Sequence, residues 1–378
     1  MRILHLFKTY LPETVGGIEQ VIYQICQSGI AHGIESDVLT LSTDPEPREL
    51  MVGDHRVHRA QLDLHVASTG FSLSVLGRFK ALAAEADVIN YHFPWPFMDV
   101  LHFAARINKP TVVTYHSDIV RQKLLLNFYR PLMNRFLGSA DRIVAASPNY
   151  LDTSEVLARY RDKTSIIPYG LDEDNYPKPS AERMRGWEQR FGQRFFLFVG
   201  VMRYYKGLHI LLEALRGTSY PVVIVGAGPL EQELRAQAQA LNLEHVHFVG
   251  RLGDEDKVAL LQLCSAIVFP SHLRSEAFGI SLLEGAMYGK PMISSEIGTG
   301  TSYINIHGET GLVVPPSDPQ AFREAMRTLW DNPQLAAEMG RQAGLRYQRL
   351  FTIERMGKQT AELYAELLDS KRRKVPAL

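Results

Sequence analysis

Residues 266–284 read Ala266-Ile-Val-Phe-Pro270, Ser271-His-Leu-Arg-Ser275 and Glu276-Ala-Phe-Gly-Ile-Ser-Leu-Leu-Glu284 and are the most informative segment of the chain. An apolar run, a polar turn and a helical pattern follow one another, and the helix is expected to stop at Gly289-Lys290-Pro291. The free N–H groups of the first helical turn favour an anion there. Glu276 precedes that turn and Glu284 lies about two turns in. The pattern therefore predicts a phosphate flanked by hydroxyl groups, as in a nucleotide sugar; two surface glutamates are the alternative.

A second helix start with glycines lies near the N-terminus. Gly16-Gly17 follows an apolar run at residues 3–7 and precedes a segment with apolar side chains at helical spacing. Glycines at such a place permit close approach of the backbone to a diphosphate. Taken alone, a Gly-Gly pair before a helix is more often a plain turn.

Composition limits the class of protein. The 378 residues are enough for two or three domains, and 46% hydrophobic with 22% charged residues is ordinary for a globular chain. Lys plus Arg equals Asp plus Glu at 41 each, which removes the bulk electrostatic case for nucleic acid. Cys26 and Cys264 fall in different halves and imply neither a disulfide framework nor a metal cluster. Without a signal-peptide pattern or an apolar run near ~20 residues, a cytoplasmic location is expected.

Short apolar runs alternate with longer helical patterns along the whole chain, which predicts an α/β fold with two doubly wound parallel sheets. The expected strands span 2–7, 36–41, 87–91, 111–115, 142–146, 164–167, 195–199, 221–225, 246–249, 266–269, 291–294 and 312–314. A Pro- and Gly-rich stretch at 168–190 marks the boundary between halves. Ligands of such sheets bind outside the carboxyl ends of the strands, the edge that Gly16, His116, Gly200 and Glu276 share.

Several ordered motifs resemble family 4 of the retaining nucleotide-sugar glycosyltransferases, which have the GT-B fold. These motifs are Gly16-Gly-Ile-Glu19, Thr114-Tyr-His-Ser-Asp118, Ile167-Pro-Tyr-Gly-Leu-Asp172, Phe198-Val-Gly200, Lys206-Gly207, Val225-Gly-Ala-Gly-Pro229, Glu276–Glu284 and Gly308-Glu-Thr-Gly-Leu312. The resemblance implies a hexosyltransferase with two Rossmann-like domains facing each other across a cleft. Residues 1–170 would bind the acceptor, with 352–378 returning to them as a crossover helix, and residues 171–351 would bind the nucleotide sugar.

The resemblance also implies the catalytic residues, which are His116, Arg203, Lys206 and Glu276. His116 would touch the donor sugar and supply its backbone to the reaction centre, and Glu276 would contact the sugar hydroxyls. Lys206 would stabilise the leaving diphosphate, a contact typically worth ~3–4 kcal/mol in the barrier. Arg203 is the less direct match, because the family usually has its Arg directly after the glycine, where this chain has Val201.

The remaining roles concern the donor and the acceptor. The donor-binding residues implied by the resemblance are Gly16, Gly17, Arg251, Leu252, Phe278, Gly279, Ile280 and Glu284. Glu284 would bind the ribose, Phe278 and Gly279 would donate backbone N–H groups, and the base would lie along residues 251–253, with Asp254 as a guanine partner. Asp118 would contact the acceptor or orient His116.

Two motifs are read as structural. Asp172-Glu173-Asp174 has the Asp-x-Asp pattern of metal-binding glycosyltransferases of the other fold, but the family has Gly-x-Asp at this place. No metal and no cofactor are therefore predicted, and the leaving phosphate would itself help to deprotonate the acceptor in a same-face, retaining reaction. Gly226-Ala-Gly228 lacks the third glycine of a dinucleotide fingerprint and is interpreted as a turn.

The sequences of four segments resemble bacterial mannosyl- and rhamnosyltransferases of O-antigen and exopolysaccharide assembly: Asn90–Pro94 followed by Thr114–Asp118, Val201–Gly207 and Ile297–Tyr303. This resemblance implies GDP-mannose or GDP-rhamnose as donor and a polyprenyl-diphosphate-linked glycan as acceptor. No spacing separates GDP from UDP, so a UDP-sugar donor stays open. A sugar-nucleotide epimerase, a phosphorylase and a non-catalytic nucleotide-sugar-binding subunit are the alternatives.

A lipid-linked acceptor implies contact with the cytoplasmic face of the inner membrane. Residues 119–137 mix apolar side chains with Arg121, Lys123, Arg130 and Arg135 and contain no acids. The cluster Lys371-Arg-Arg-Lys374 would add ~1 kcal/mol per residue near anionic lipid. Peripheral membrane binding through these two segments is expected; a core helix with a solvated basic face and a disordered tail is the alternative.

Overall fold

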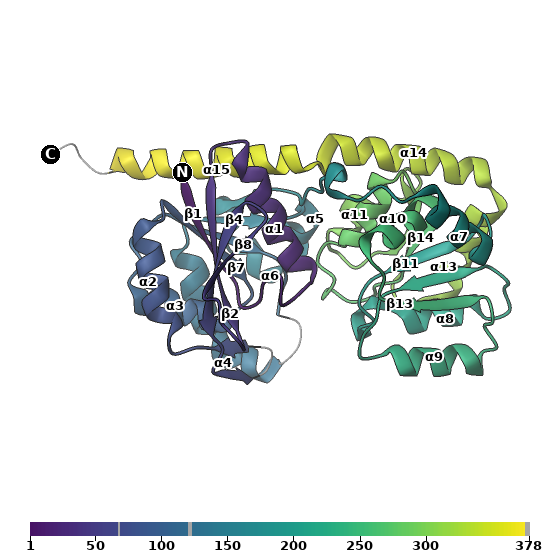
Figure 1. Cartoon of the computed structure of the whole chain (residues 1–378), viewed down its shortest axis with the longest axis horizontal. Helices are drawn as coiled ribbons and strands as arrows, with labels where there is room; N and C mark the ends of the chain where they lie inside the picture. The colour runs from purple at the N-terminus through teal and green to yellow at the C-terminus, as the bar shows by residue number, and fades with distance from the viewer. Residues whose placement is uncertain (67–68, 120–122, 375–378) are drawn as a thin grey trace. The chain divides into compact units, whose positions relative to one another are not determined.

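The computed structural model describes residues 1–66, 69–119 and 123–374. The chain divides into two compact units (Figure 1). Unit 1 comprises Met1–Gly170 together with Ile353–Leu378, and unit 2 comprises Leu171–Thr352. Each unit contains its own sheet and its own core.

The main sheet of unit 1 has eight strands in the order β10-β9-β8-β7-β1-β2-β4-β3, all parallel except β3, which is antiparallel to β4. A two-stranded antiparallel hairpin, β5-β6, lies apart from it. The strands are β1 (Arg2–Leu6), β2 (Glu35–Ser42), β3 (Glu49–Val52), β4 (His55–Gln61), β5 (Leu64–Val66), β6 (Thr69–Phe71), β7 (Val88–Phe93), β8 (Thr111–Tyr115), β9 (Arg142–Ala145) and β10 (Thr164–Ile166).

The helices of unit 1 include one from the far end of the chain. They are α1 (Gly17–Ile30), α2 (Val75–Glu85), α3 (Pro96–Ala105), α4 (Lys123–Ser139), α5 (Pro148–Thr153), α6 (Glu155–Ala158), η1 (Arg161–Lys163) and α15 (Ile353–Lys374). In Figure 1 the yellow α15 runs beside α1. A Cβ at Gly357 of α15 would lie 2.7 Å from both the Cβ and the carbonyl oxygen of Ser28, so a glycine is needed for the two helices to approach this closely.

Unit 2 has one six-stranded parallel sheet in the order β13-β12-β11-β14-β15-β16. Its strands are β11 (Phe196–Val199), β12 (Val222–Val225), β13 (Val246–Gly250), β14 (Ala266–Phe269), β15 (Met292–Ser295) and β16 (Gly311–Val314). Its helices are η2 (Glu173–Asn175), α7 (Ala181–Phe191), η3 (Tyr204–Lys206), α8 (Leu208–Leu215), α9 (Glu231–Ala240), α10 (Asp254–Leu263), α11 (Ile280–Met287), α12 (Thr301–Ile304), α13 (Pro319–Asp331) and α14 (Pro333–Leu350).

The predicted α/β class with doubly wound sheets is confirmed, and each predicted strand overlaps a strand of the structure. The predicted parallel sheets are found in both units; in unit 1 one further strand, β3, runs antiparallel at the edge. Four strands, β3 to β6, were not predicted. β4, for example, reads His-Arg-Val-His-Arg-Ala-Gln, and two apolar residues among five polar ones gave no apolar run to recognise.

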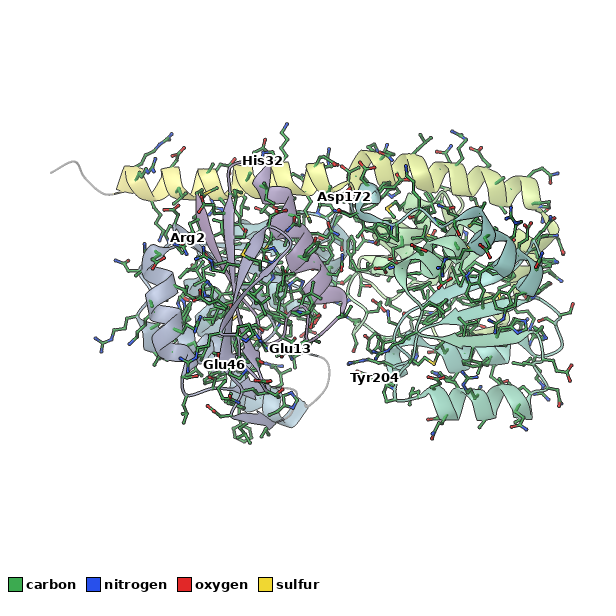
Figure 2. All side chains as sticks on the ribbon, in the orientation of Figure 1. Arg2, Glu13, His32, Glu46, Asp172 and Tyr204 are labelled. Carbon is green, nitrogen blue, oxygen red and sulfur yellow. The ribbon has the colours of Figure 1, made fainter. Side chains whose placement is uncertain are left out.

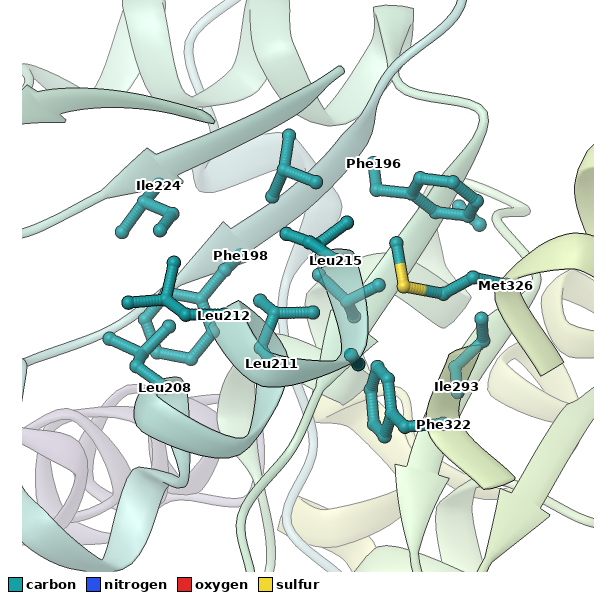
Figure 3. Close-up of a cluster of buried hydrophobic side chains, with 14 of the residues drawn as sticks. Phe196, Phe198, Leu208, Leu211, Leu212, Leu215, Ile224, Ile293, Phe322 and Met326 are labelled. Atoms are coloured by element: carbon teal, nitrogen blue, oxygen red, sulfur yellow. The ribbon is translucent and has the colours of Figure 1, made fainter. Parts of the chain in front are cut away.

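The core of unit 2 holds its sheet rigidly beneath the loops that carry the candidate site. Phe196, Phe198 and Ile224 of the sheet pack against α8, which buries Leu208, Leu211, Leu212 and Leu215 (Figure 3). Phe322 and Met326 of α13 complete the cluster. Because these apolar side chains are almost completely buried, the strands of this sheet are fixed by burial of apolar surface.

The Gly226–Gly228 turn is a packing feature. A Cβ at Gly226 would lie 2.0 Å from the carbonyl oxygen of Gly200, and one at Gly228 would lie 2.5 Å from that of Met202. Gly226 also has a φ of 128°, a conformation that side chains with a Cβ rarely adopt. The two glycines therefore let the loop after β12 lie directly on the loop after β11.

We expect Gly226→Ala to destabilise unit 2 by about 2–4 kcal/mol, because backbone strain and a backbone clash add. Gly217→Ala is the matched control, since Gly217 also has a positive φ, 74°, but a Cβ there meets nothing within 4 Å. Urea unfolding of the two variants measures the difference. Equal losses of stability would show that the contact with Gly200 is unimportant.

Candidate functional site

The unit 2 sheet has a topological switch point between β11 and β14. From this pair of neighbouring strands the chain proceeds outward in both directions, through β12 and β13 on one side and through β15 and β16 on the other. The loops that follow the two strands, residues 200–207 and 270–279, leave from the same carboxyl edge. A doubly wound sheet binds its ligands at this position.

Lys206 and Glu276 meet at the switch point. The Lys206 Nζ lies 2.5 Å from Oε2 of Glu276, and the side chains are only 12% and 10% exposed. Ser271 donates a hydrogen bond to the same Oε2 at 3.1 Å. The Lys206 ammonium also lies 5.0 Å from the ring centre of Phe269, the last residue of β14. The predicted diphosphate-binding cation and sugar-binding carboxylate are therefore brought together as an ion pair.

The glycine after Lys206 makes this meeting possible. Gly207 has a φ of 68°, and a Cβ there would lie 2.0 Å from the carbonyl oxygen of Pro270. The short η3 turn can therefore close onto the loop after β14 only if residue 207 is glycine. The Lys206-Gly207 motif thus combines a charged side chain with the backbone conformation that positions it.

Glu284 is the second predicted carboxylate, and it has a lysine partner of its own. It lies at the start of the second turn of α11, nearer the helix start than the predicted two turns. Lys257 Nζ donates to its Oε1 at 2.9 Å, and the Tyr176 hydroxyl donates to the same oxygen at 3.0 Å. Lys257 lies on α10 and Tyr176 follows η2, so sequence reasoning missed both, because only the fold brings them to Glu284.

The charges of this second pair stabilise each other. Burial alone would lower the pKa of Lys257, but the Glu284 carboxylate overcomes it, and the pKa of Lys257 is raised. Burial and the same carboxylate raise the pKa of the Tyr176 hydroxyl. Lys257 is thus a cation and Tyr176 a neutral hydrogen-bond donor at neutral pH.

The start of α11 lies between the two carboxylates in sequence. Gly279 is its N-cap residue with a φ of 101°, and Ile280 begins the helix. The Phe278 side chain is buried against Phe351, with ring centres 6.2 Å apart. This buried ring anchors the loop, and a ligand role of Phe278 and Gly279 is thereby restricted to their main chain.

Two more predicted site residues of unit 2 are exposed, the catalytic candidate Arg203 and the donor-binding candidate Arg251. Arg203 lies in the loop after β11, and Arg251 with half-buried Leu252 lies after β13, all at the carboxyl edge of the sheet. Asp254, the predicted guanine partner, begins α10 and lies 3.3 Å from Lys257 Nζ. Because β13 is the outermost strand on its side, residues 251 and 252 lie away from the switch point.

In unit 1, His116 directly follows β8 and is buried. Its Nε2 shares a hydrogen bond of 2.9 Å with Nδ1 of His92, and its Nδ1 shares one of 2.7 Å with the Tyr169 hydroxyl. The expectation that Asp118 orients His116 is wrong, since these two partners engage both ring nitrogens. Asp118 instead accepts hydrogen bonds from Tyr115 at 2.8 Å and from Ser154 at 2.7 Å.

The glycine pair begins α1 as predicted, with Gly16 as its N-cap. A Cβ at Gly16 would lie 2.6 Å from the Glu19 Oε2, so the carboxylate of Glu19 lies over the helix start. Thr9 donates to the other oxygen of Glu19 at 2.8 Å. A glycine at position 16 is therefore explained by packing alone, because a side chain there would clash with the buried carboxylate of Glu19 on the same helix.

The Asp-x-Asp segment caps a short turn. Asp172, labelled in Figure 2, accepts hydrogen bonds from the Asp174 N–H at 3.0 Å and from the Asn175 side chain at 2.6 Å. Across residues 1–66, 69–119 and 123–374, no three His, Cys, Asp or Glu side chains are grouped to hold a metal ion.

The two basic segments lie on helices. In α4, Arg130 and Arg135 are exposed, as is 86% of Phe128, whereas Arg121 and the side chain of Lys123 lie outside the described residues. Residues 371–374 are the last residues of α15, so the basic cluster predicted for the tail lies on a helix. Lys371 forms an ion pair with Asp141 at 2.8 Å. None of the described helices is both long and apolar enough to cross a bilayer.

Comparison with known proteins identifies the family. Residues 15–175 match the model of Glycosyltransferase Family 4, and residues 181–346 match that of Glycosyl transferases group 1. D-rhamnosyltransferase WbpZ of Pseudomonas aeruginosa is 72% identical over 352 residues, which are 93% of this chain and 92% of that protein. The chain is a family 4 glycosyltransferase. O-antigen chain mannosyltransferase C of Escherichia coli is 53% identical over 371 residues, which are 98% of this glycosyltransferase and 100% of the relative.

Solved structures agree on the fold. Sucrose-phosphate synthase from Thermosynechococcus elongatus has a TM-score of 0.80 at 23% identity and covers 98% of this glycosyltransferase and 99% of its own chain. HepE of Anabaena has a TM-score of 0.76 at 21% identity, with 97% and 100% covered. The predicted GT-B fold is confirmed by these neighbours, and at this identity they show the fold alone.

The buried histidines make unit 1 of the glycosyltransferase sensitive to acid. Burial lowers the pKa of His116 to about 3, that of His5 to about 3, and that of His92 well below its ordinary value. The unfolded chain takes up protons at these residues near pH 6.5, whereas the folded chain does not. Their contribution to stability is therefore complete above pH 6.5 and is lost as the pH falls toward 3.

We expect these three histidines together to lower the free energy of unfolding of unit 1 by up to about 4 kcal/mol per pH unit below pH 6.5, about 1.4 for each histidine. Urea unfolding at pH 7, 6 and 5 measures it, with Trp95 as the reporter after Trp187→Phe and Trp330→Phe. His5→Gln should reduce the slope by about 1.4 kcal/mol per pH unit, and His65→Gln, which changes an exposed residue, should not. A free energy that stays constant from pH 7 to 5 would contradict the assignment.

Proposed function

We propose that the enzyme transfers D-rhamnose or mannose, with retention of configuration, from a GDP-sugar to a lipid-linked glycan during O-antigen or related polysaccharide assembly. The names of two relatives, a D-rhamnosyltransferase and an O-antigen chain mannosyltransferase, at 72% and 53% identity, support the sugar and the pathway. The observation that carries the proposal is the buried Lys206–Glu276 pair at the switch point of the unit 2 sheet.

The two lysine–carboxylate pairs suggest how a nucleotide sugar is held. Lys206 and Ser271 both bind Oε2 of Glu276, and we assign the other oxygen to a hydroxyl of the transferred sugar. Lys257 and Tyr176 both bind Oε1 of Glu284, and its other oxygen is assigned to the ribose. Each carboxylate is thus fixed through one oxygen and presents the second to the donor.

The reaction requires negative charge to be stabilised on the leaving diphosphate. Lys206 supplies a positive charge at Glu276, which precedes α11 in the chain, and the main-chain N–H groups at the start of α11 add partial positive charge. In the proposed reaction the bond between the anomeric carbon and the phosphate oxygen breaks, the acceptor oxygen bonds to the same face, and the leaving phosphate takes the acceptor proton. Metal is not required in this proposal, since protein cations and dipoles supply the charge.

Nucleotide release tests the proposal. We expect acceptor-dependent GDP release in EDTA from GDP-mannose or GDP-D-rhamnose with a lipid-diphosphate glycan, and little release from UDP-glucose or UDP-N-acetylglucosamine. Glu276→Gln should lower kcat by about 10²–10³-fold, because it removes a preorganised charge from the site. Glu338→Gln, on the exposed surface of α14, is the matched control.

Other outcomes of the same assay identify the alternatives. Release from UDP-sugars alone would contradict the GDP assignment. Conversion of the donor without acceptor would indicate an epimerase, and a requirement for inorganic phosphate would indicate a phosphorylase. Tight binding of a nucleotide sugar with no turnover would indicate a binding subunit.

Peripheral membrane contact through α4 and the end of α15 is part of the proposal, since exposed Phe128 and Arg130 combine apolar and cationic character. We expect the double variant Phe128→Ser, Arg130→Glu to lose sedimentation with anionic vesicles at low salt. Leu345→Ser, Arg349→Glu replaces one exposed apolar residue by Ser and one exposed Arg by Glu on α14 and serves as control. Equal sedimentation of both variants would contradict the proposal.

A further inference from the structure

A stripe of polar side chains is buried on one face of the unit 1 sheet. His5 of β1 pairs in register with Asn90 of β7, and His92 of β7 pairs with Thr114 of β8. Partners in register share a face, as do residues two apart on one strand, so His116, two residues beyond Thr114, continues the stripe. Uncompensated polar groups in a core cost several kcal/mol, which calls for an explanation of this placement.

The three histidines and a tyrosine form one hydrogen-bonded chain. His5 Nδ1 and His92 Nε2 are 3.0 Å apart, His92 Nδ1 and His116 Nε2 are 2.9 Å apart, and His116 Nδ1 and the Tyr169 hydroxyl are 2.7 Å apart. The rings also stack, with centres 5.3 Å apart for His5–His92 and 5.2 Å apart for His92–His116. Hydrogen bonds and stacking together hold each ring in one orientation.

The hydrogen-bonded chain of side chains constrains which ring nitrogen of each histidine can carry the proton. A neutral imidazole has one N–H donor and one bare nitrogen acceptor. If Tyr169 donates to His116, then His116 must donate to His92 and His92 to His5; if the first bond reverses, all must reverse. With Tyr169 as the donor, His116 is held as the Nε2–H tautomer by a partner at each nitrogen, and neither nitrogen is left to exchange a proton with a substrate.

We propose that His92 and Tyr169 are positioning residues for the glycosyl transfer: they fix the ring and tautomer of His116, so that residue 116 meets the donor sugar through its ring carbon edge and main chain. This inference rests on the proposed function, together with the contact between His116 and the donor sugar that the family resemblance implies. It gives a role to Tyr169 in the Ile167–Asp172 motif and to His92 in the Asn90–Pro94 segment, two stretches whose chemistry sequence reasoning left unassigned.

The experiment compares two deletions of one buried hydroxyl. Tyr169→Phe removes the partner of His116 Nδ1. Tyr364→Phe removes a hydroxyl that accepts from Asn90 at 2.8 Å, outside the histidine chain, and both tyrosines line the same cavity of about 10 Å³. We expect Tyr169→Phe to lower kcat about 10- to 100-fold, with the KM for the GDP-sugar near that of the parent enzyme. Tyr364→Phe should keep the parent kcat.

A second readout does not require turnover. In protein labelled with ¹⁵N-histidine, the ring signals of His116, assigned with His116→Gln, should show a single neutral tautomer in the parent and in Tyr364→Phe. In Tyr169→Phe they should show a mixture. His92→Asn should also disturb them, since it shortens the side chain that reaches Nε2.

The outcomes separate the positioning role from the proposed function. A parent kcat in Tyr169→Phe, or unchanged His116 signals, would overturn the positioning role even in an active enzyme. A parent enzyme that releases no nucleotide from any GDP-sugar would overturn the proposed function, and the tautomer signals would then still decide whether Tyr169 and His92 fix His116.

Discussion

The candidate site depends on one constraint, the contact between the loop after β11 and the loop after β14. Gly207 lies against the carbonyl of Pro270, and this contact places Lys206 within 2.5 Å of Glu276. The two strands are neighbours only because the sheet is doubly wound, so the ion pair is a direct product of the strand order. The Lys206 ammonium and the Glu276 carboxylate are both about nine-tenths buried and stabilise each other. In the proposed function both groups also bind the polar ligand.

The arrangement at Glu284 repeats that at Glu276. In each case a lysine and a hydroxyl group bind the same carboxylate oxygen. Such a carboxylate cannot rotate freely, so little ordering remains to be done when a ligand binds. His116 in unit 1 follows the same principle by different means, because its partners are neutral and its ring is fixed by hydrogen bonds at both nitrogens.

Sequence reasoning recovered the parts of this molecule that depend on local pattern. Buried parallel strands are continuous apolar runs, so β11 and β14 could be recognised, and the glycines at 207 and 279 marked the turns that follow. β4 was missed because its apolar residues are few, although it pairs with β2 from Arg56 to Gln61. Lys257, Tyr176 and His92 were missed for another reason: each acts through a partner far away in sequence, and no spacing rule connects them.

The return of α15 to unit 1 has a consequence for how the protein is made. The hydrogen bond between Asn90 and Tyr364 closes across 274 positions of the chain, and α15 covers Ile25 and Thr114 at a small cavity in the core. Unit 2 is one continuous segment and can complete its core as soon as it leaves the ribosome. Unit 1, although translated first, must wait with part of its apolar surface uncovered until the last helix has been synthesised. The order in which the units finish folding is therefore the reverse of the order in which they begin.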